Sequence, residues 1–270
     1  MSAAATETGQ DRIAAAFAGA AGRAALMPYL MGGFPDAETS ARIGEAYADA
    51  GADLVELGVP FSDPLADGPV IHAAGTRALA AGVTLHHVLE VGARLAQRLP
   101  VVLMCYANPM LARGAERFAD ELAVRRISGL IVPDLPLEEA PAVLAACDAA
   151  GVALVPLAAP TTPEARLAAI GARARGFLYT VSVTGTTGER ASGDAAELIA
   201  RAKAASAAPV ALGFGISTPE QAAAAAAAGA DGVIVGSRLV RAAAEAFDAG
   251  EDPAAAAGAV VAELAAGLAR

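Results

Sequence analysis

The chain has 270 residues, of which 56% are apolar, and a formal net charge of −10 without any cluster of basic side chains. This composition argues against nucleic acid and anionic membranes as partners and fits an acidic protein of the cytoplasm. The length suits one large α/β domain. Because no Ser/Gly/Pro-rich linker follows residue 25, we expect residues 1–270 to form a single domain.

The N-terminal segment is rich in Ala, but Gly22 and Arg23 interrupt the apolar run around residues 13–31. The run therefore fits neither the apolar region of a signal peptide nor a membrane-spanning helix. We expect residues 1–12 to be poorly ordered and one amphipathic helix to precede the first strand.

Eight apolar runs rich in Val, Leu and Ile alternate with Ala-rich segments of helical length. The runs cover residues 25–32, 52–58, 101–106, 129–134, 153–158, 176–183, 209–215 and 232–237. Near-continuous apolar strands that alternate with helices are typical of a parallel sheet covered on its outer face. Eight such units favour an α/β fold of the closed (β/α)8 TIM-barrel type over an open doubly wound sheet.

Capping residues mark the starts of several helices. Asp36 is expected to cap the helix after the first strand, and Thr162 to cap a helix that begins at Pro163. Thr218 and Gln221 have the spacing of a capping box. Each of these starts follows a strand by only a few residues.

Two connections are longer than the others, residues 59–74 after the second strand and about 184–193 after the sixth. In barrels, long loops at the C-terminal ends of strands hold the chemistry and its lids. The sequence ELGVPFSDPLADGP ends the second strand and leads into the first of these loops. It contains three carboxylates, Glu56, Asp63 and Asp67, and no Lys or Arg.

Glu56 is the strongest candidate for a catalytic group. It lies at the C-terminal end of its strand and is expected to face the same way as Leu54. A buried carboxylate without a partner costs several kcal/mol or has a raised pKa, and proton transfer is a common reason for such a residue. The alternative is a Glu that pairs with a distant Arg for structural reasons.

An internal repeat provides a comparison for Glu56. The segment AGADLVELG at residues 50–58 returns as AGADGVIVG at residues 228–236, and Ile234 occupies the position of Glu56. The structural occupant of this position is therefore an apolar residue, which favours the catalytic interpretation.

The basic residues exclude several mechanisms. The single lysine, Lys203, falls in a polar helical stretch, so no amine is placed for Schiff-base chemistry with a carbonyl substrate or with pyridoxal phosphate. The histidines are His72 and the adjacent pair His86 and His87, which makes a His-based metal site improbable. We expect no metal and no organic cofactor in this chain.

Glycines follow three of the last strands. Gly213 and Gly215 end the seventh, Gly236 and Ser237 end the eighth, and both pairs lead into helix starts. Free N–H groups at such helix starts form the phosphate site of many barrels. Gly188, in the loop after the sixth strand, is expected to join this site, although a surface turn is the alternative there. The residues thus predict a phosphorylated small molecule that undergoes proton transfer.

At this point the motifs resemble one family closely, the α subunit of tryptophan synthase. The resemblance covers most of the chain and rests on the following stretches: PYLMGGFPD, ELGVPFSDPLADGP, CYANP, VPDLPLEE, SVTGTTG, GFGIS and GVIVGS. It implies retro-aldol cleavage of indole-3-glycerol phosphate to indole and glyceraldehyde 3-phosphate.

The resemblance also implies roles for individual residues. Glu56 matches the general acid/base, Asp67 the carboxylate that holds the indole N–H, and Tyr179 a tyrosine beside the substrate. The segments that contact phosphate match Gly188, Gly213, Gly215, Gly236 and Ser237. Tyr29 and Met104 match positions near the indole, where we expect ordinary apolar lining, and for Tyr106 and Asp134 we expect packing or hydrogen bonding.

The family implies a partner as well, a pyridoxal-phosphate-dependent β subunit in an α2β2 assembly. Two other readings stay open. The chain could be an interaction subunit that only docks on and regulates a partner, or a different phosphate-binding barrel lyase or isomerase. Indole-glycerol phosphate synthase, a related barrel, relies on lysine and is therefore disfavoured.

Overall fold

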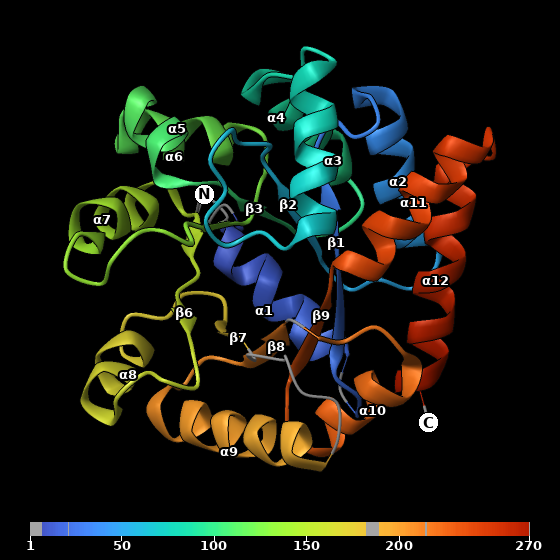
Figure 1. Cartoon of the computed structure of the whole chain (residues 1–270). Helices are drawn as coiled ribbons and strands as arrows, with labels where there is room; N and C mark the ends of the chain where they lie inside the picture. The colour runs from blue at the N-terminus through green and yellow to red at the C-terminus, as the bar shows by residue number, and fades with distance from the viewer. Residues whose placement is uncertain (1–6, 21, 182–188, 214, 270) are drawn as a thin grey trace, which may run out of the picture.

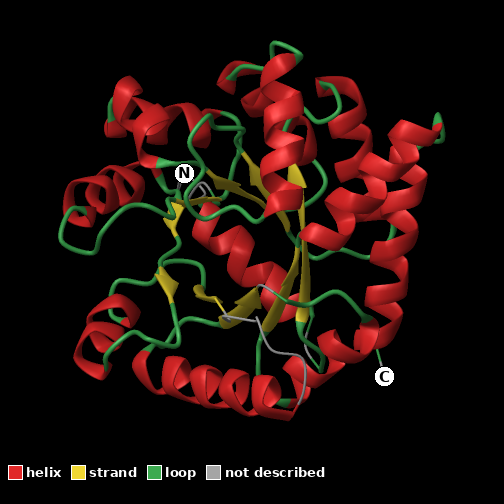
Figure 2. Cartoon of the chain, viewed as in Figure 1, coloured by secondary structure: helices red, strands yellow, loops and turns green. Residues whose placement is uncertain are grey.

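The structure, a computed structural model, describes residues 7–20, 22–181, 189–213 and 215–269. A ring of parallel strands lies at the centre, and helices cover its outer face (Figure 2). The strands are β1 (Ala25–Met31), β2 (Val55–Gly58), β3 (Val101–Met104), β4 (Gly129–Ile131), β5 (Ala153–Leu154), β6 (Leu157–Ala158), β7 (Leu178–Val181), β8 (Val210–Gly213) and β9 (Gly232–Val235).

The strands hydrogen-bond in the order β5-β4-β3-β2-β1-β9-β8-β7-β6. Every pairing is parallel, with β5 on β4 and β6 on β7 at the two ends of this order. The predicted fifth strand, residues 153–158, is therefore present as two short pieces. The prediction of a (β/α)8 barrel is confirmed.

Pro156 causes the break between β5 and β6, because proline has no N–H to donate to a ladder. On one side of the break, the Val155 N–H donates to the Leu130 carbonyl at 2.9 Å. On the other side, the Tyr179 N–H donates to the Pro156 carbonyl at 3.0 Å. The two pieces of this one segment thus join β4 to β7 and close the ring.

The helices follow the strands around the ring (Figure 1). They are α1 (Gly9–Gly19), α2 (Ala37–Asp49), α3 (Pro69–Ala80), α4 (Leu85–Leu95), α5 (Ala107–Arg113), α6 (Ala115–Val124), α7 (Ala140–Ala150), α8 (Glu164–Gly171), α9 (Glu189–Ala205), α10 (Pro219–Ala227), α11 (Ser237–Ala249) and α12 (Pro253–Leu268). None of the helices within the described ranges is long and apolar enough to cross a membrane.

The loop after β2 is shorter than expected. It covers residues 59–68, because α3 begins at Pro69 and not near residue 75. Proline suits the first helical position, since its fixed φ matches the helix and its missing N–H is not needed there. After β7, residues 182–188 lie outside the described residues, and α9 begins at Glu189, earlier than the predicted loop of about 184–193 implies.

The cap predictions are confirmed in two of three cases. The Asp36 carboxylate accepts from the Thr39 N–H at 2.8 Å, and Thr218 forms its capping box with Gln221. The prediction for Thr162 is wrong, because α8 begins one residue later than Pro163. The Thr162 hydroxyl instead accepts from the Ala159 N–H at 3.0 Å and closes a turn.

The N-terminal helix begins earlier than expected, at Gly9, so residues 9–12 form its first turn. A capping box between Thr8 and Asp11 fixes this start, as the Asp11 carboxylate accepts from the Thr8 N–H at 2.9 Å. The Arg12 guanidinium adds hydrogen bonds to the Arg126 and Ala96 carbonyls. These contacts hold the first turn of α1 against the rest of the chain.

Helix α1 crosses the barrel axis inside the ring of helices (Figure 1). Ile13 is fully buried in the cluster of side chains that fills the barrel interior. Phe17 packs on Phe177, with 5.7 Å between the ring centroids, and against Gly232 at the start of β9. The helix therefore closes the N-terminal end of the barrel, which leaves the other end as the mouth.

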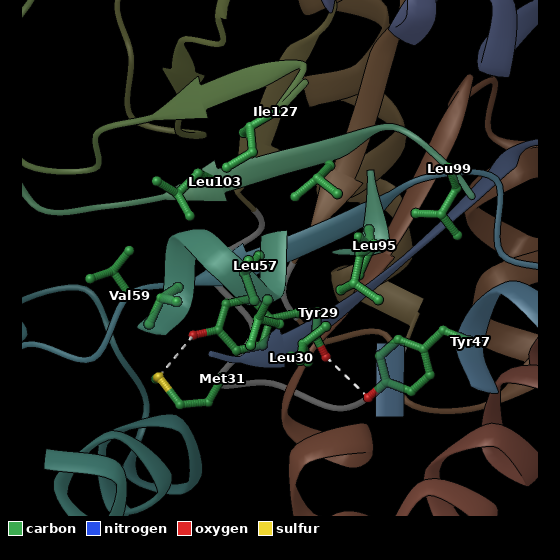
Figure 3. Packing of buried hydrophobic residues seen from close by; sticks show 14 of the residues in the cluster. Tyr29, Leu30, Met31, Tyr47, Leu57, Val59, Leu95, Leu99, Leu103 and Ile127 are labelled. Atoms are coloured by element: carbon green, nitrogen blue, oxygen red, sulfur yellow. Dashed lines mark hydrogen bonds between the residues drawn. The ribbon is translucent and has the colours of Figure 1, made fainter. Parts of the chain in front are cut away.

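Two apolar layers hold the barrel together. Residues that face the interior pack on α1, and residues that face outward pack under the helices. Figure 3 shows part of the outer layer, in which Leu57 of β2 lies among Leu30, Leu95, Leu103 and Ile127. Because successive side chains of a strand alternate between faces, the outward position of Leu57 turns Glu56 toward the interior.

The internal repeat has a structural basis in its aspartates. Asp53 accepts from the Leu26 N–H at 2.8 Å and pairs with Arg23 at 2.7 Å. Asp231, at the same position of the second copy, accepts from the Val210 N–H at 2.8 Å. In both copies the carboxylate thus ties the entrance of one strand to the backbone of a neighbouring strand.

Candidate active site

Glu56 lies on β2 inside the barrel, with only 1% of the residue exposed. Its Oε1 atom has no hydrogen-bond partner, and no Arg pairs with it within the described parts of the chain. Burial raises the pKa of Glu56 to about 8, and the negative charge of Asp67 adds to the rise. At neutral pH the group is therefore mainly protonated, which suits an acid that must also recover its proton.

The second copy of the repeat places Ile234 opposite to Glu56 across β1. Glu56 lies beside Tyr29 of β1, while Ile234 of β9 lies beside Met27 of the same strand. Ile234 is 2% exposed. The scaffold thus accommodates an apolar side chain in this environment, and packing alone does not require the carboxyl group of Glu56.

Asp67 lies in the loop between β2 and α3 and is held there by Tyr106. The Tyr106 hydroxyl donates to Asp67 Oδ1 and accepts from the Ala66 N–H, each at 2.9 Å. Partial burial raises the pKa of Asp67, whereas the hydrogen bond from Tyr106 and the charge of His72 lower it. The hydrogen-bonding role expected for Tyr106 is therefore confirmed.

Tyr106 and Asp134 together stabilise the rim of the mouth. The ring of Tyr106 stacks on Phe61, with 5.1 Å between centroids. Asp134 follows β4 and accepts from the Ala107 N–H at 2.8 Å, at the start of α5. Hydrogen bonding was also the expectation for Asp134.

Two more tyrosines, Tyr29 of β1 and Tyr179 of β7, face the interior and are 6% and 3% exposed. Burial raises the pKa of both phenols well above its usual range, and the charge of Glu56 acts in the same direction. Glycines make room for both rings: Gly58 lies against the Tyr29 hydroxyl, and Gly213 against the Tyr179 ring. Both phenols are neutral at physiological pH.

The predicted phosphate site is partly described. Gly236 is the N-cap of α11 and Ser237 its first residue, and no side chain caps this helix. Gly215 has a φ of +80°, which favours glycine, and lies shortly before α10. Gly213 is buried at the end of β8 beneath Tyr179. The predicted residue Gly188 lies outside the described residues.

One cavity of about 1240 Å³ brings most of these groups together at the mouth. Its lining includes the following residues that the sequence singles out: Tyr29, Glu56, Asp67, Met104, Tyr179, Gly215, Ile234, Gly236 and Ser237. The carboxyl group of Glu56 thus shares one apolar cavity with the start of α11, which is the arrangement that the sequence predicts.

Two arginines of the cavity were missed in the sequence. Arg238 and Arg241 lie in the first two turns of α11 and also line the cavity. Arg238 donates to the Ser217 carbonyl at 2.7 Å and pairs with Glu263 at 2.5 Å. Their positions directly after Gly236 and Ser237 were a usable signal, because guanidinium groups beside a helix start favour an anion.

Lys203 lies on α9, where it pairs with Asp231 at 2.9 Å and does not line the cavity. Within the described residues, no group of three or more His, Cys, Asp or Glu side chains is placed to hold a metal ion.

The fold and the cavity define a (β/α)8-barrel enzyme with a buried carboxyl group in a cavity at the C-terminal face of the barrel. The family model "Tryptophan synthase alpha chain" matches residues 16–268. The chain therefore belongs to the tryptophan synthase alpha chain family.

Individual relatives agree with this assignment. The tryptophan synthase alpha chain of Prochlorococcus marinus is 52% identical over 84% of both chains. The structure of tryptophan synthase subunit alpha from Legionella pneumophila has a TM-score of 0.88 at 36% identity and covers 96% of this chain and 98% of that one. A tryptophan synthase structure from Pyrococcus furiosus has a TM-score of 0.83 at 36% identity, with coverage of 90% and 98%.

Proposed function

We propose that the chain cleaves indole-3-glycerol phosphate to indole and glyceraldehyde 3-phosphate, with Glu56 as its general acid/base. The observation that carries this assignment is the carboxyl group of Glu56 in the cavity of a tryptophan synthase alpha chain, with its Oε1 buried and without a partner among the described residues. Burial raises the pKa of this group to about 8. The reaction belongs to tryptophan biosynthesis, and we place it in the cytoplasm.

The reaction needs one proton at two places in turn. Glu56 gives its proton to C3 of the indole, which leaves positive charge on the ring nitrogen. The Glu56 carboxylate then takes the proton of the hydroxyl on the adjacent carbon. The bond between this carbon and C3 breaks, its electrons return to the ring, and the carbon becomes the aldehyde. Glu56 ends the cycle protonated, as it began.

The other site residues are assigned around this step. Asp67 binds the indole N–H and stabilises the positive charge that develops there. Tyr179 lies beside the substrate. The phosphate binds at Gly188, Gly213, Gly215, Gly236 and Ser237, where the start of α11 offers free N–H groups.

The proposed partner is a tryptophan synthase β subunit in an α2β2 assembly, and pyridoxal phosphate belongs to that subunit. The Pyrococcus furiosus structure is described as showing mutual activation of such a complex. In this chain Leu65 is 88% exposed in the loop that contains Asp67. A partner that covers this leucine would also order the loop and close the mouth over an apolar product.

The test is the variant Glu56→Gln. The amide has nearly the same volume but cannot shuttle a proton, so we expect the fold to be kept and the formation of glyceraldehyde 3-phosphate to fall at least about a hundredfold. Asp63→Asn, which changes an exposed carboxylate of the same loop, is the matched control and should keep full activity.

Two outcomes would contradict the proposal. More than about a hundredth of the activity in Glu56→Gln would remove Glu56 from its role. No cleavage by the wild-type chain, alone or with a β subunit, would instead favour a subunit that only regulates its partner.

A further inference from the structure

The phenol of Tyr29 lies in the cavity without a strong hydrogen-bond acceptor among the described residues. Within that part of the chain its hydroxyl donates only to the Met31 thioether, and the distance from Oη to Sδ is 4.0 Å (Figure 3). A thioether sulfur is a weak acceptor, and a buried hydroxyl normally finds a better one. By contrast, the Tyr106 hydroxyl both donates and accepts at 2.9 Å. Tyr29 thus has donor capacity that the resting structure leaves almost unused.

Glu56, in turn, lacks a hydrogen-bond donor among the described residues. Its Oε1 is buried without a partner among the described residues. A protonated carboxyl group tolerates this, but a carboxylate in the same position needs a donor. The proposed reaction, on which this inference rests, makes Glu56 a carboxylate in every cycle.

Strand pairing places the two groups side by side. Tyr29 of β1 and Glu56 of β2 are Cα partners in adjacent parallel strands, so their side chains leave neighbouring positions on the same face of the sheet. Gly58, two residues after Glu56, has no side chain, and the Tyr29 hydroxyl lies in the space this leaves. A side chain at residue 58 would force the phenol away from β2.

The other groups around Glu56 are less suited to donate. Asp67 of the following loop is an anion, and the neighbour on β3, Val102, is apolar. The charge of Glu56 also raises the pKa of Tyr179 on β7. However, β7 is separated from β2 in the sheet by β1, β9 and β8. Tyr29 is the phenol on the strand directly beside Glu56.

We propose that Tyr29 is a positioning residue whose hydroxyl leaves Met31 and donates a hydrogen bond to Glu56 once Glu56 has given up its proton. The hydroxyl then stabilises the carboxylate through the interval between the two proton transfers. A phenylalanine would line the cavity equally well and could not do this. Tyr29 is thereby more than the apolar lining that the sequence predicts.

The test is Tyr29→Phe, which removes only the hydroxyl. The fraction of protonated Glu56 is followed against pH by the infrared band of its carboxyl group, identified by its loss in Glu56→Gln. We expect the midpoint, near pH 8 in the wild type, to move about one pH unit higher in Tyr29→Phe. We also expect kcat to fall about tenfold, while KM changes less than twofold.

Tyr47→Phe is the matched control. Tyr47 is equally buried, but its hydroxyl donates to the Tyr29 backbone carbonyl at 3.4 Å and does not line the cavity. This variant should leave the midpoint where it is. The proposal is overturned if the midpoint does not move in Tyr29→Phe, or if it moves equally in Tyr47→Phe. It is also overturned if Tyr179→Phe shifts the midpoint and Tyr29→Phe does not.

The infrared titration and the cleavage assay distinguish a failure of this inference from a failure of the proposed function. The infrared titration needs no substrate and reports the contact between Tyr29 and Glu56 directly. If the wild-type chain fails to cleave indole-3-glycerol phosphate, the proposed function is wrong, whatever the titration shows.

Discussion

A carboxyl group buried without a partner makes the folded chain hold a proton that the unfolded chain gives up. The pKa of Glu56 is about 8 in the folded state, against an ordinary value of 4.5. Between these two values the unfolded chain is ionised and the folded chain is not. Folding stability therefore falls as the pH rises through this window and is constant above it.

We therefore expect Glu56→Gln to stabilise the fold relative to wild type by an amount that increases with pH, because the amide does not ionise. The free energy of unfolding of this variant, relative to wild type, should increase by up to about 1.4 kcal/mol per pH unit between pH 5 and pH 8. Thermal unfolding over this range measures it. Asp63→Asn serves as the control, and a difference that stays constant with pH would mean that Glu56 is not protonated in the folded state.

Among the elements, the loop of residues 59–68 after β2 depends on a residue that follows the neighbouring strand, β3. The Tyr106 hydroxyl binds both the Ala66 N–H and the Asp67 carboxylate. It therefore fixes the loop and also opposes the rise in the pKa of Asp67 that burial causes.

Tyr106→Phe should separate this loop from the rest of the site. Without the hydroxyl, Asp67 loses a donor, its pKa rises, and its position is less well defined. We expect kcat/KM to fall about tenfold or more, since a hydrogen bond to a charged group contributes about 1.5–3 kcal/mol. Binding of glycerol phosphate should not change, because the start of α11 lies elsewhere. Full activity would show that the loop holds Asp67 without Tyr106.

The start of α11 allows an equally clean test of the phosphate site. Gly236 has a φ of −115°, and a Cβ there would meet Tyr29 Cβ at 3.7 Å, an ordinary contact. Gly236→Ala should therefore bind glycerol phosphate nearly as the wild type does. Gly236→Leu should bind it at least about tenfold more weakly, because the side chain covers the helix N–H groups. Equal Kd values for both variants would place the phosphate elsewhere.

Local sequence signals explain what could be predicted about the elements. The alternating runs gave all eight strand positions, and Asp36 and Thr218 cap helices as expected. The proline in the fifth run was visible, but which neighbours the two halves would join depends on register across the ring. Thr162 failed as a cap because its hydroxyl closes a turn with Ala159, an option that spacing alone does not exclude.

At the scale of the whole molecule, local sequence signals also limit what could be predicted about the site. The sequence could place Glu56 inside the barrel, because it alternates with Leu57 along one strand. It could not show that Tyr29 and Tyr179, which lie far apart in the chain, both face Glu56. Nor could it show that Tyr106 holds Asp67. These relations arise only when the ring closes, since the partners in each contact come from different strands or strand ends.

The whole molecule has one open end, and the proposed partner would cover it. We expect the isolated chain to be a weak lyase whose kcat rises at least about tenfold, a barrier change of roughly 1.4 kcal/mol, when a tryptophan synthase β subunit is added. Titration of the β subunit while following glyceraldehyde 3-phosphate measures this rise.

Two exposed apolar residues make the titration specific. Leu65→Asp alters the rim and should weaken both activation and co-elution. Val124→Asp alters an apolar residue at the end of α6 that is 82% exposed, and it should weaken neither activation nor co-elution. A flat titration, with chains that also fail to co-elute, would show that the loop closes without help.

The position of the single lysine has a practical consequence. Lys203 is exposed on α9 and pairs with Asp231, the residue just before β9, so it lies at the end of the barrel that α1 closes. Apart from the α-amino group, its side chain is the one primary amine in the sequence. A dye or a bead coupled to that amine is attached on the side away from the cavity. Chains immobilised in this way would all present their open ends to the solution, ready for single-molecule or surface measurements of docking.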